Sequence, residues 1–379
     1  MTYLVDGRYI QDHFPGIGRY VFNLIEAFAR VAPDRRFRVL VNPGLRNTRF
    51  DLGLLSRRRN LELVPVSAPT FSPREQGLGL NRSLTANASL WHSAYYIMPY
   101  LLPVPAVVTL EDVTPLVVVE EMPGAAKRIL YRLLNRIAAW RARSIITLSH
   151  AAERDIVQLL GVPPHKLTVV PLAADERFRP CSAKEIAETR SAWGLDQYVL
   201  YLGSNKPHKN LVRLVQAWAQ VSTDIPLVIA GHWDPRYPDP MQMAARLNIS
   251  HRVRFIHDLA NAQLPALLGG AQLFVFPSVH EGFGLPPLEA MACGAPVACA
   301  NASSLPEVVG EAAALFNPLD VEGMAGVLTR VLEDSTLRTE LSARSLVQAG
   351  RFSWDRTARE TLAVYHKIQS IDHAHSASL

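Results

Sequence analysis

The chain has 379 residues, of which 49% are hydrophobic and 19% charged, with a formal net charge of +5. This composition excludes a disordered, collagen-like or low-complexity protein, and the length is typical of two domains. No apolar run reaches the roughly 20 residues of a membrane-spanning helix, and the N-terminus lacks the features of a signal peptide. Three scattered cysteines (Cys181, Cys293 and Cys299) predict neither a disulfide framework nor a zinc site and favour the cytoplasm.

Short apolar runs alternate with amphipathic stretches along the whole chain, a pattern typical of parallel βαβ units. The first series of predicted strands covers residues 3–5, 37–41, 61–66, 106–110, 144–148 and 167–170. A second series, at residues 198–202, 226–230, 253–256, 273–276 and 296–300, begins after a turn-like segment at residues 171–180. We therefore predict an α/β fold of two doubly wound, Rossmann-like parallel-sheet domains, with ligands beyond the carboxyl ends of the strands.

The loop after the predicted strand at residues 273–276 carries the strongest functional signal. Gly282 and Gly284 permit close backbone approach to a ligand, and a predicted helix follows, with Glu289 expected in its first turn. Free N–H groups at a helix start bind anions, whereas the carboxylates of Glu281 and Glu289 only accept hydrogen bonds and suit hydroxyls. The segment therefore predicts a nucleotide-sugar site, unless it is a plain glycine turn with one solvated and one helix-capping glutamate.

These residues also carry a family resemblance. The run EGFGLPPLEAMACGAPV, with its Glu-x7-Glu spacing, and the run SSLPEVVG resemble the retaining glycosyltransferases of family 4, the group 1 glycosyltransferases. Weaker matches lie at residues 15–20, 92–93, 171–180 and 203–210. The resemblance implies the GT-B fold: an acceptor-side domain (residues 1–178), a nucleotide-sugar-binding domain (179–353) facing it across a cleft, and a helix (354–372) that crosses back to the first domain.

The resemblance also implies roles for single residues. Lys209 would neutralise the leaving diphosphate, and Glu281 would contact the transferred sugar; with Glu111, these are the predicted catalytic residues. The predicted donor-binding residues are Gly18, Ser204, His208, Lys209, His257, Asp258, Glu281, Gly282, Phe283, Gly284, Leu285 and Glu289. The predicted acceptor-side residues are Gly16, His92, Tyr95, Glu111 and Asp112.

Two positions depart from the family pattern. His208 stands where the family often has arginine, so the phosphate clamp is weakened or shifted to Lys206. Glu111 stands where the family commonly has histidine. A carboxylate can accept a hydrogen bond or stabilise positive charge, but we expect that it cannot donate as a neutral imidazole does. A different donor sugar, a tuned mechanism, lost activity and a merely structural acid beside Asp112 all remain open.

The expected function is metal-independent, retaining transfer of a hexose from a GDP- or UDP-sugar to a glycan or lipid-linked acceptor, in polysaccharide or glycoconjugate biosynthesis. No cofactor and no metal are expected, because no Asp-x-Asp follows a strand. The alternative is a degenerate family member that binds a nucleotide sugar or a membrane partner without catalysis. An epimerase or a phosphorylase of the same fold fits the Glu281 segment less well.

Basic residues crowd one predicted helix of the first half. Residues 1–180 carry 23 Lys and Arg against 15 Asp and Glu, whereas residues 181–379 carry 16 against 19. Residues 124–143 contain six cations and no acid, and Arg128, Arg132 and Arg136 share one helix face. The range Lys127–Arg143 predicts peripheral contact with anionic lipid at the inner face of the cell membrane; a core-facing helix with a solvated arginine face is the alternative. No nucleic-acid partner is expected.

Overall fold

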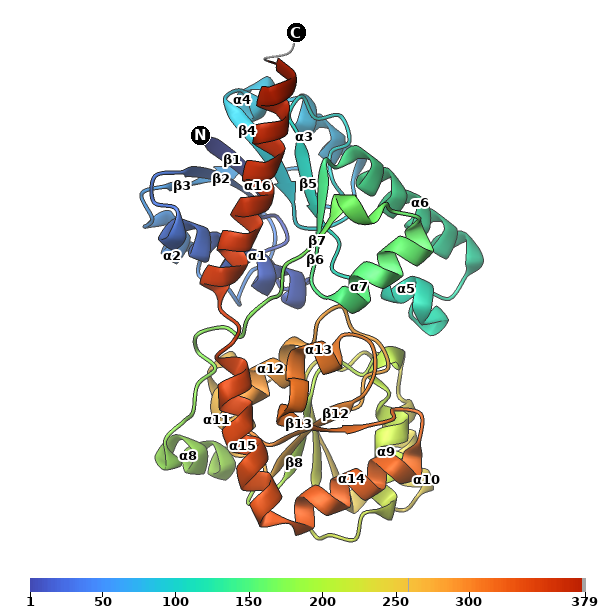
Figure 1. Ribbon diagram of the computed structural model, residues 1–379. Helices are drawn as coiled ribbons and strands as arrows, with labels where there is room; N and C mark the ends of the chain where they lie inside the picture. The colour runs from blue at the N-terminus through green and yellow to red at the C-terminus, as the bar shows by residue number, and fades with distance from the viewer. Residues whose placement is uncertain (258, 377–379) are drawn as a thin grey trace. The chain divides into compact units, whose positions relative to one another are not determined.

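The computed structural model describes residues 1–257 and 259–376 and divides into two compact units. Unit 1 comprises Met1–Leu116, Gly124–Leu172 and the chain from Ser353 onward, and unit 2 comprises Val117–Pro123 and Ala173–Phe352. Each unit is built around its own parallel sheet (Figure 1). The assignment of residues 117–123 to unit 2, apart from their sequence neighbours, was not predicted from the sequence.

In the described residues, unit 1 holds a seven-stranded sheet of order β3-β2-β1-β4-β5-β6-β7. Its strands are β1 (Thr2–Asp6), β2 (Arg36–Val41), β3 (Leu61–Pro65), β4 (Ala88–Ser93), β5 (Ala106–Thr109), β6 (Ser144–Thr147) and β7 (Leu167–Val169). Every neighbouring pair runs parallel. The strand order reverses between β1 and β4, which is where an open α/β sheet forms its ligand crevice.

Helices surround this sheet, and the last of them comes from the far end of the chain. They are α1 (Pro15–Val31), α2 (Leu52–Ser56), α3 (Gln76–Leu80), α4 (Arg82–Thr85), α5 (Thr114–Val117), α6 (Ala125–Arg141), α7 (His150–Asp155) and α16 (Trp354–Ser376). Helix α16 packs against α1 (Figure 1). Two polar contacts accompany this packing: Arg30 Nη2 lies 2.7 Å from Asp355 Oδ1, and the Tyr365 hydroxyl lies 2.6 Å from a ring nitrogen of His92.

Unit 2 holds, in its described part, a six-stranded parallel sheet of order β10-β9-β8-β11-β12-β13. Its strands are β8 (Val199–Leu202), β9 (Leu227–Ala230), β10 (Val253–Ile256), β11 (Leu273–Phe276), β12 (Val297–Ala300) and β13 (Ala313–Phe316). One layer of helices consists of α9 (Leu211–Gln220), α10 (Asp239–Arg246) and α14 (Val321–Glu333). The opposite layer consists of α8 (Ala183–Trp193), α11 (Leu264–Gly269), α12 (Leu285–Ala292) and α15 (Ser335–Ala349) (Figure 1). Helix α13 (Leu305–Val309) follows β12.

The strands explain why both sheets lie inside. The strand β11 reads LFVF and is buried throughout, as expected for a strand covered by helices on both faces. Every strand predicted from the sequence is present, whereas β4 and β13 were not predicted. His92 and Ser93, one of the weaker family matches, are therefore the last residues of the unpredicted strand β4. Within the described residues, none of the helices combines the length and the apolar character that crossing a bilayer requires.

Candidate active site

The candidate site in unit 2 forms where the strand order reverses. Strands β8 and β11 are neighbours in the sheet, so the loops that follow them leave the same edge side by side. Two contacts hold these loops together: the Val279 N–H donates to the His208 carbonyl at 2.9 Å, and Ser278 Oγ lies 3.0 Å from the same carbonyl oxygen. The loops at residues 203–210 and 277–284, singled out from the sequence, are thus one structural feature.

Lys209 and Glu281 form an ion pair at this junction. Lys209 Nζ lies 2.5 Å from Glu281 Oε1, both side chains are 13% exposed, and Ser278 Oγ donates to the same carboxylate oxygen at 2.5 Å. Burial acts to raise the pKa of Glu281, but the charges of Lys209 and His208 and these hydrogen bonds outweigh it, so the pKa lies below its usual value. The structure therefore places an ammonium beside an ionised carboxylate where the two loops meet.

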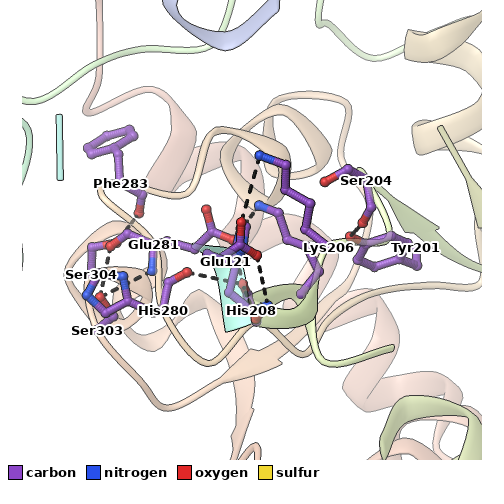
Figure 2. A network of polar contacts seen from close by, with 12 residues as sticks. Glu121, Tyr201, Ser204, Lys206, His208, His280, Glu281, Phe283, Ser303 and Ser304 are labelled. Carbon is purple, nitrogen blue, oxygen red and sulfur yellow. Dashed lines mark hydrogen bonds and ion pairs between the residues drawn. The ribbon is translucent and has the colours of Figure 1, made fainter. Parts of the chain in front are cut away.

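His208 and Lys206 hold a second carboxylate, that of Glu121 (Figure 2). His208 Nδ1 lies 2.5 Å from Glu121 Oε1, and Lys206 Nζ lies 3.8 Å from Oε2. Burial acts to raise the pKa of Glu121, and the contacts with His208 and Lys206 bring it below its usual value. Glu121 was not predicted as a site residue, because nothing in the sequence connects it with a histidine 87 residues away.

The glycine loop before α12 is shaped by hydrogen bonds and by one left-handed residue. Ser304 Oγ donates to the Phe283 carbonyl at 2.6 Å and to the Glu281 carbonyl at 2.9 Å. Gly284 has φ of 119°, and a Cβ there would lie 2.8 Å from Leu305 Cδ2, so only glycine fits. Helix α12 begins at Leu285, directly after this loop. The backbone N–H groups of residues 283–285 therefore lie at the helix start, as an anion site requires.

The predicted donor-binding residues also include Ser204, His257, Asp258 and Glu289. Glu289 lies in the second turn of α12, 2% exposed; its expected place in the first turn is wrong, because the helix begins only at Leu285. The Ser204 carbonyl accepts a hydrogen bond from the Tyr201 hydroxyl at 2.7 Å. His257 is exposed and meets the Trp233 ring edge-on, with 5.6 Å between ring centroids. Asp258 lies outside the described residues.

In unit 1, Glu111 lies two residues after β5 and has one buried carboxyl oxygen. Its Oε1 is inaccessible to solvent and has no hydrogen-bond partner among the described residues. Burial, with the nearby charge of Asp112, raises the pKa of Glu111 to about 8. At pH 7 the neutral carboxylic acid therefore predominates, and its O–H can donate a hydrogen bond. This protonation state departs from the expectation that Glu111 cannot donate a hydrogen bond as a neutral imidazole does.

His92, a predicted acceptor-side residue, belongs to a buried hydrogen-bond chain. It is 1% exposed; Nδ1 lies 2.6 Å from the Tyr365 hydroxyl, and Nε2 lies 2.8 Å from Thr109 Oγ1, which also contacts the Tyr20 hydroxyl. Burial lowers the pKa of His92 to about 3, so the ring is neutral. Because both ring nitrogens are already bonded, the structure argues against a direct acceptor contact and favours a structural role.

The remaining acceptor-side residues lie around the carboxyl ends of β1, β4 and β5. Tyr95 belongs to an aromatic cluster with Tyr9, Phe14 and Phe71. Asp112 Oδ1 accepts from the Thr114 N–H at 2.8 Å. Gly16 and Gly18 lie in the first turn of α1, not in a loop. A Cβ on Gly18 would lie 2.9 Å from the Tyr9 carbonyl oxygen, whereas one on Gly16 would meet no atom within 4 Å.

Comparisons with known proteins agree with this architecture. A family model described as glycosyl transferases group 1 matches residues 185–346, and one described as a glycosyl transferase 4-like domain matches residues 15–173. The chain is 31% identical to O-antigen chain mannosyltransferase B of Escherichia coli over 320 residues, 82% of each protein. It is 28% identical to the serotype-specific mannosyltransferase WbdA of E. coli, a match that covers 96% of this chain but 47% of that longer protein.

Among solved structures, HepE of Anabaena in complex with UDP-glucose matches 96% of this chain and 100% of its own, with a TM-score of 0.74 and 20% identity. This likeness concerns the fold alone. The identity to the first mannosyltransferase and the two family matches together settle the family. The chain belongs to the group 1 glycosyltransferases and has their two-domain α/β fold, GT-B.

Proposed function

We propose that the chain is a retaining, metal-independent glycosyltransferase that moves a hexose from a GDP- or UDP-sugar to a glycan or lipid-linked acceptor. The names of its relatives, O-antigen mannosyltransferases, support a mannose-type donor and a role in cell-surface polysaccharide assembly. The UDP-glucose in HepE supports a nucleoside-diphosphate sugar as the donor class. The observation that carries the proposal is the Lys209–Glu281 pair, whose glutamate lies in the loop that leads into α12.

The proposed reaction breaks the bond between the anomeric carbon and the diphosphate oxygen and joins that carbon to an acceptor oxygen. Lys209 and the N–H groups of residues 283–285 stabilise the charge that develops on the leaving diphosphate. Glu281 binds hydroxyls of the transferred sugar. The proton of the acceptor hydroxyl passes to the leaving diphosphate, so the proposal includes no protein nucleophile. Glu111 contributes a hydrogen bond through its acidic O–H.

A donor panel tests this proposal. The protein is incubated with UDP-, GDP-, ADP- and dTDP-sugars and with glycan and polyprenyl-phosphate acceptors, and nucleotide release is followed. We expect release with one donor, product of unchanged anomeric configuration by NMR, and an unchanged rate in EDTA. Inverted product or loss of activity in EDTA contradicts the corresponding part of the proposal. Nucleotide-sugar binding without release in every acceptor mixture supports the degenerate alternative.

Membrane contact through α6 is a second part of the proposal. The buried face of this helix carries Tyr131, Asn135 and Ala138. Ile129 and Trp140 are 67% and 80% exposed, so these apolar side chains of the helix do not face the core. Leu130 and Leu133 are also exposed, as are Lys127, Arg132 and Arg136. An exposed stripe of apolar side chains bordered by cations suits an anionic lipid surface.

Arg141, one of the cations in the range Lys127–Arg143, contacts the protein's own backbone. The Arg141 guanidinium donates to the carbonyls of Tyr100 at 2.9 Å and of Leu102 at 2.6 Å, so it holds the loop before β5. Arg132 and Arg136 remain the exposed arginines at the centre of the helix. The proposed lipid contact therefore rests on these two arginines and on the exposed apolar side chains Ile129, Leu133 and Trp140.

Liposome co-sedimentation measures this contact. We expect salt-sensitive binding to vesicles of anionic lipid, and a loss of about 1 kcal/mol per charge on neutralisation, so that Arg132→Gln with Arg136→Gln weakens binding roughly thirtyfold. Replacing Ile129, Leu133 and Trp140 with serine abolishes binding. The matched control replaces Leu319 and Val347, exposed apolar residues of unit 2, with serine and leaves binding unchanged. Equal binding by all variants overturns the proposal.

A further inference from the structure

Residues 117–123 bring one side chain of the first half of the sequence into the candidate donor site. The chain on either side belongs to unit 1, but this segment packs in unit 2. There the short turn η2 (Val119–Glu121) contacts η5 (Pro207–Lys209), the turn that carries His208 and Lys209. The Glu121 side chain is 7% exposed, whereas its neighbour Glu120 is exposed. Glu121 is thus the acid of this segment that enters the site.

The groups around the Glu121 carboxylate are those that bind a phosphate. Oε1 lies 2.5 Å from His208 Nδ1 and accepts from the His208 backbone N–H at 3.4 Å, while Oε2 lies 3.8 Å from Lys206 Nζ. Figure 2 shows the carboxylate between the two side chains. An ammonium, an imidazole and a backbone N–H converging on one anion also suit a phosphate group. The carboxylate therefore marks an anion subsite within the loop after β8.

The charges of the site favour exchange of this carboxylate for a diphosphate. The two ammonium groups of Lys206 and Lys209 face the carboxylates of Glu121 and Glu281. A nucleotide sugar adds one negative charge per phosphate. If Glu121 stayed in place, these charges would lie against a partly buried carboxylate, where like charges repel strongly. If Glu121 leaves, Lys206 and His208 become available to the incoming phosphates.

We propose that the Glu121 carboxylate holds the place of a donor phosphate in the unliganded protein and that a nucleoside diphosphate must displace it to reach Lys206 and His208. This inference rests on the proposed function, because it assumes that a nucleoside-diphosphate sugar is the donor. It adds a competition between a carboxylate of the chain and the ligand. The donor binds only those molecules whose subsite is vacant. The competition therefore lowers the apparent donor affinity in proportion to the fraction of such molecules.

Binding of UDP and GDP to the full-length chain by isothermal titration calorimetry tests the competition. Glu121→Gln keeps the shape of the side chain and removes its charge, and we expect it to bind nucleotide about five- to tenfold more tightly than the unmodified protein. Glu120→Gln changes the net charge equally on an exposed neighbour and is expected to stay within about twofold. Equal affinity of Glu121→Gln and Glu120→Gln overturns the inference.

The direction of the change separates this role from others. If Glu121 instead positions His208 for the donor, Glu121→Gln binds nucleotide more weakly, which also overturns the inference. A merely structural role cannot raise the affinity. Inorganic pyrophosphate provides a second probe that lacks base and sugar, and the same order of affinities is expected for it. If neither nucleotide binds any of the three proteins, the proposed donor site itself fails; nucleotide binding that Glu121→Gln leaves unchanged removes only the competition.

Discussion

Replacement of Lys209 by methionine is expected to lower kcat about 10²- to 10³-fold, because the leaving diphosphate loses its charge partner in the transition state. Methionine keeps much of the length of the side chain and its contact with the Phe276 ring, which lies 5.2 Å from Lys209 Nζ. The measurement is single-turnover release of the nucleotide from the donor that the panel identifies. Lys184→Met is the matched control, because Lys184 is an exposed lysine paired with Glu188 on α8.

A double variant separates two causes of that loss. Removal of Lys209 also leaves Glu281 without its ion-pair partner in a nearly buried position, and an unpaired buried carboxylate disturbs a site by itself. Lys209→Met with Glu281→Gln removes both charges. If the unpaired carboxylate causes the defect, the double variant recovers activity over Lys209→Met. If Lys209 acts on the leaving group, the double variant stays inactive.

The second large effect concerns Glu111 and alkaline pH. Because burial raises the pKa of Glu111 to about 8, its O–H is present at neutral pH and is lost as the pH rises through that value. We expect kcat/KM to be level near pH 7 and to fall about tenfold per pH unit above pH 8. Glu111→Gln keeps a hydrogen-bond donor that does not titrate, so it retains activity within about tenfold and loses the alkaline decline.

Two further variants define what Glu111 does. Glu111→Ala removes the donor altogether and is expected to lower kcat/KM about 10²-fold at pH 7. Glu111→His restores the side chain that the family commonly has there. A profile that rises through pH 8 in the unmodified protein, with an inactive Glu111→Gln, identifies the carboxylate as the working form and contradicts the hydrogen-bond role. A flat profile in the unmodified protein likewise argues against titration of Glu111.

The sequence predicts most of the fold because buried parallel strands leave a strong signal. Runs such as LFVF are apolar at every position, and the helices between them are long enough to separate one strand from the next. Strand β4 escaped because its sequence, ASLWHS, mixes polar and apolar residues, and β13 because AALF is short and rich in alanine. Both are recognised only through the strands with which they pair.

The candidate site also has a part that the sequence predicts and a part that it does not. Lys209 and Glu281 were predicted because their loops follow strands and resemble loops of the family; the structure brings them together because β8 and β11 are neighbours in the sheet. The partners that set their chemistry were not predictable. Glu121 reaches His208 through the placement of a short segment, and the pKa of Glu111 depends on burial that no local pattern records. His92 is the opposite case. It was predicted as an acceptor-side residue, but its ring is hydrogen-bonded to the Tyr365 hydroxyl.

The return of α16 to unit 1 has a consequence for how the protein is made. On the ribosome, the strands of unit 1 emerge before Ala173–Phe352, but Tyr365, which bonds His92, and Asp355, which pairs with Arg30, are synthesised after that range. Unit 1 therefore waits, with part of its core uncovered, while all of Ala173–Phe352 is translated. Unit 2 needs only Val117–Pro123 from upstream and can fold in the meantime. The unit whose strands are translated first is thus completed only after unit 2 has been synthesised.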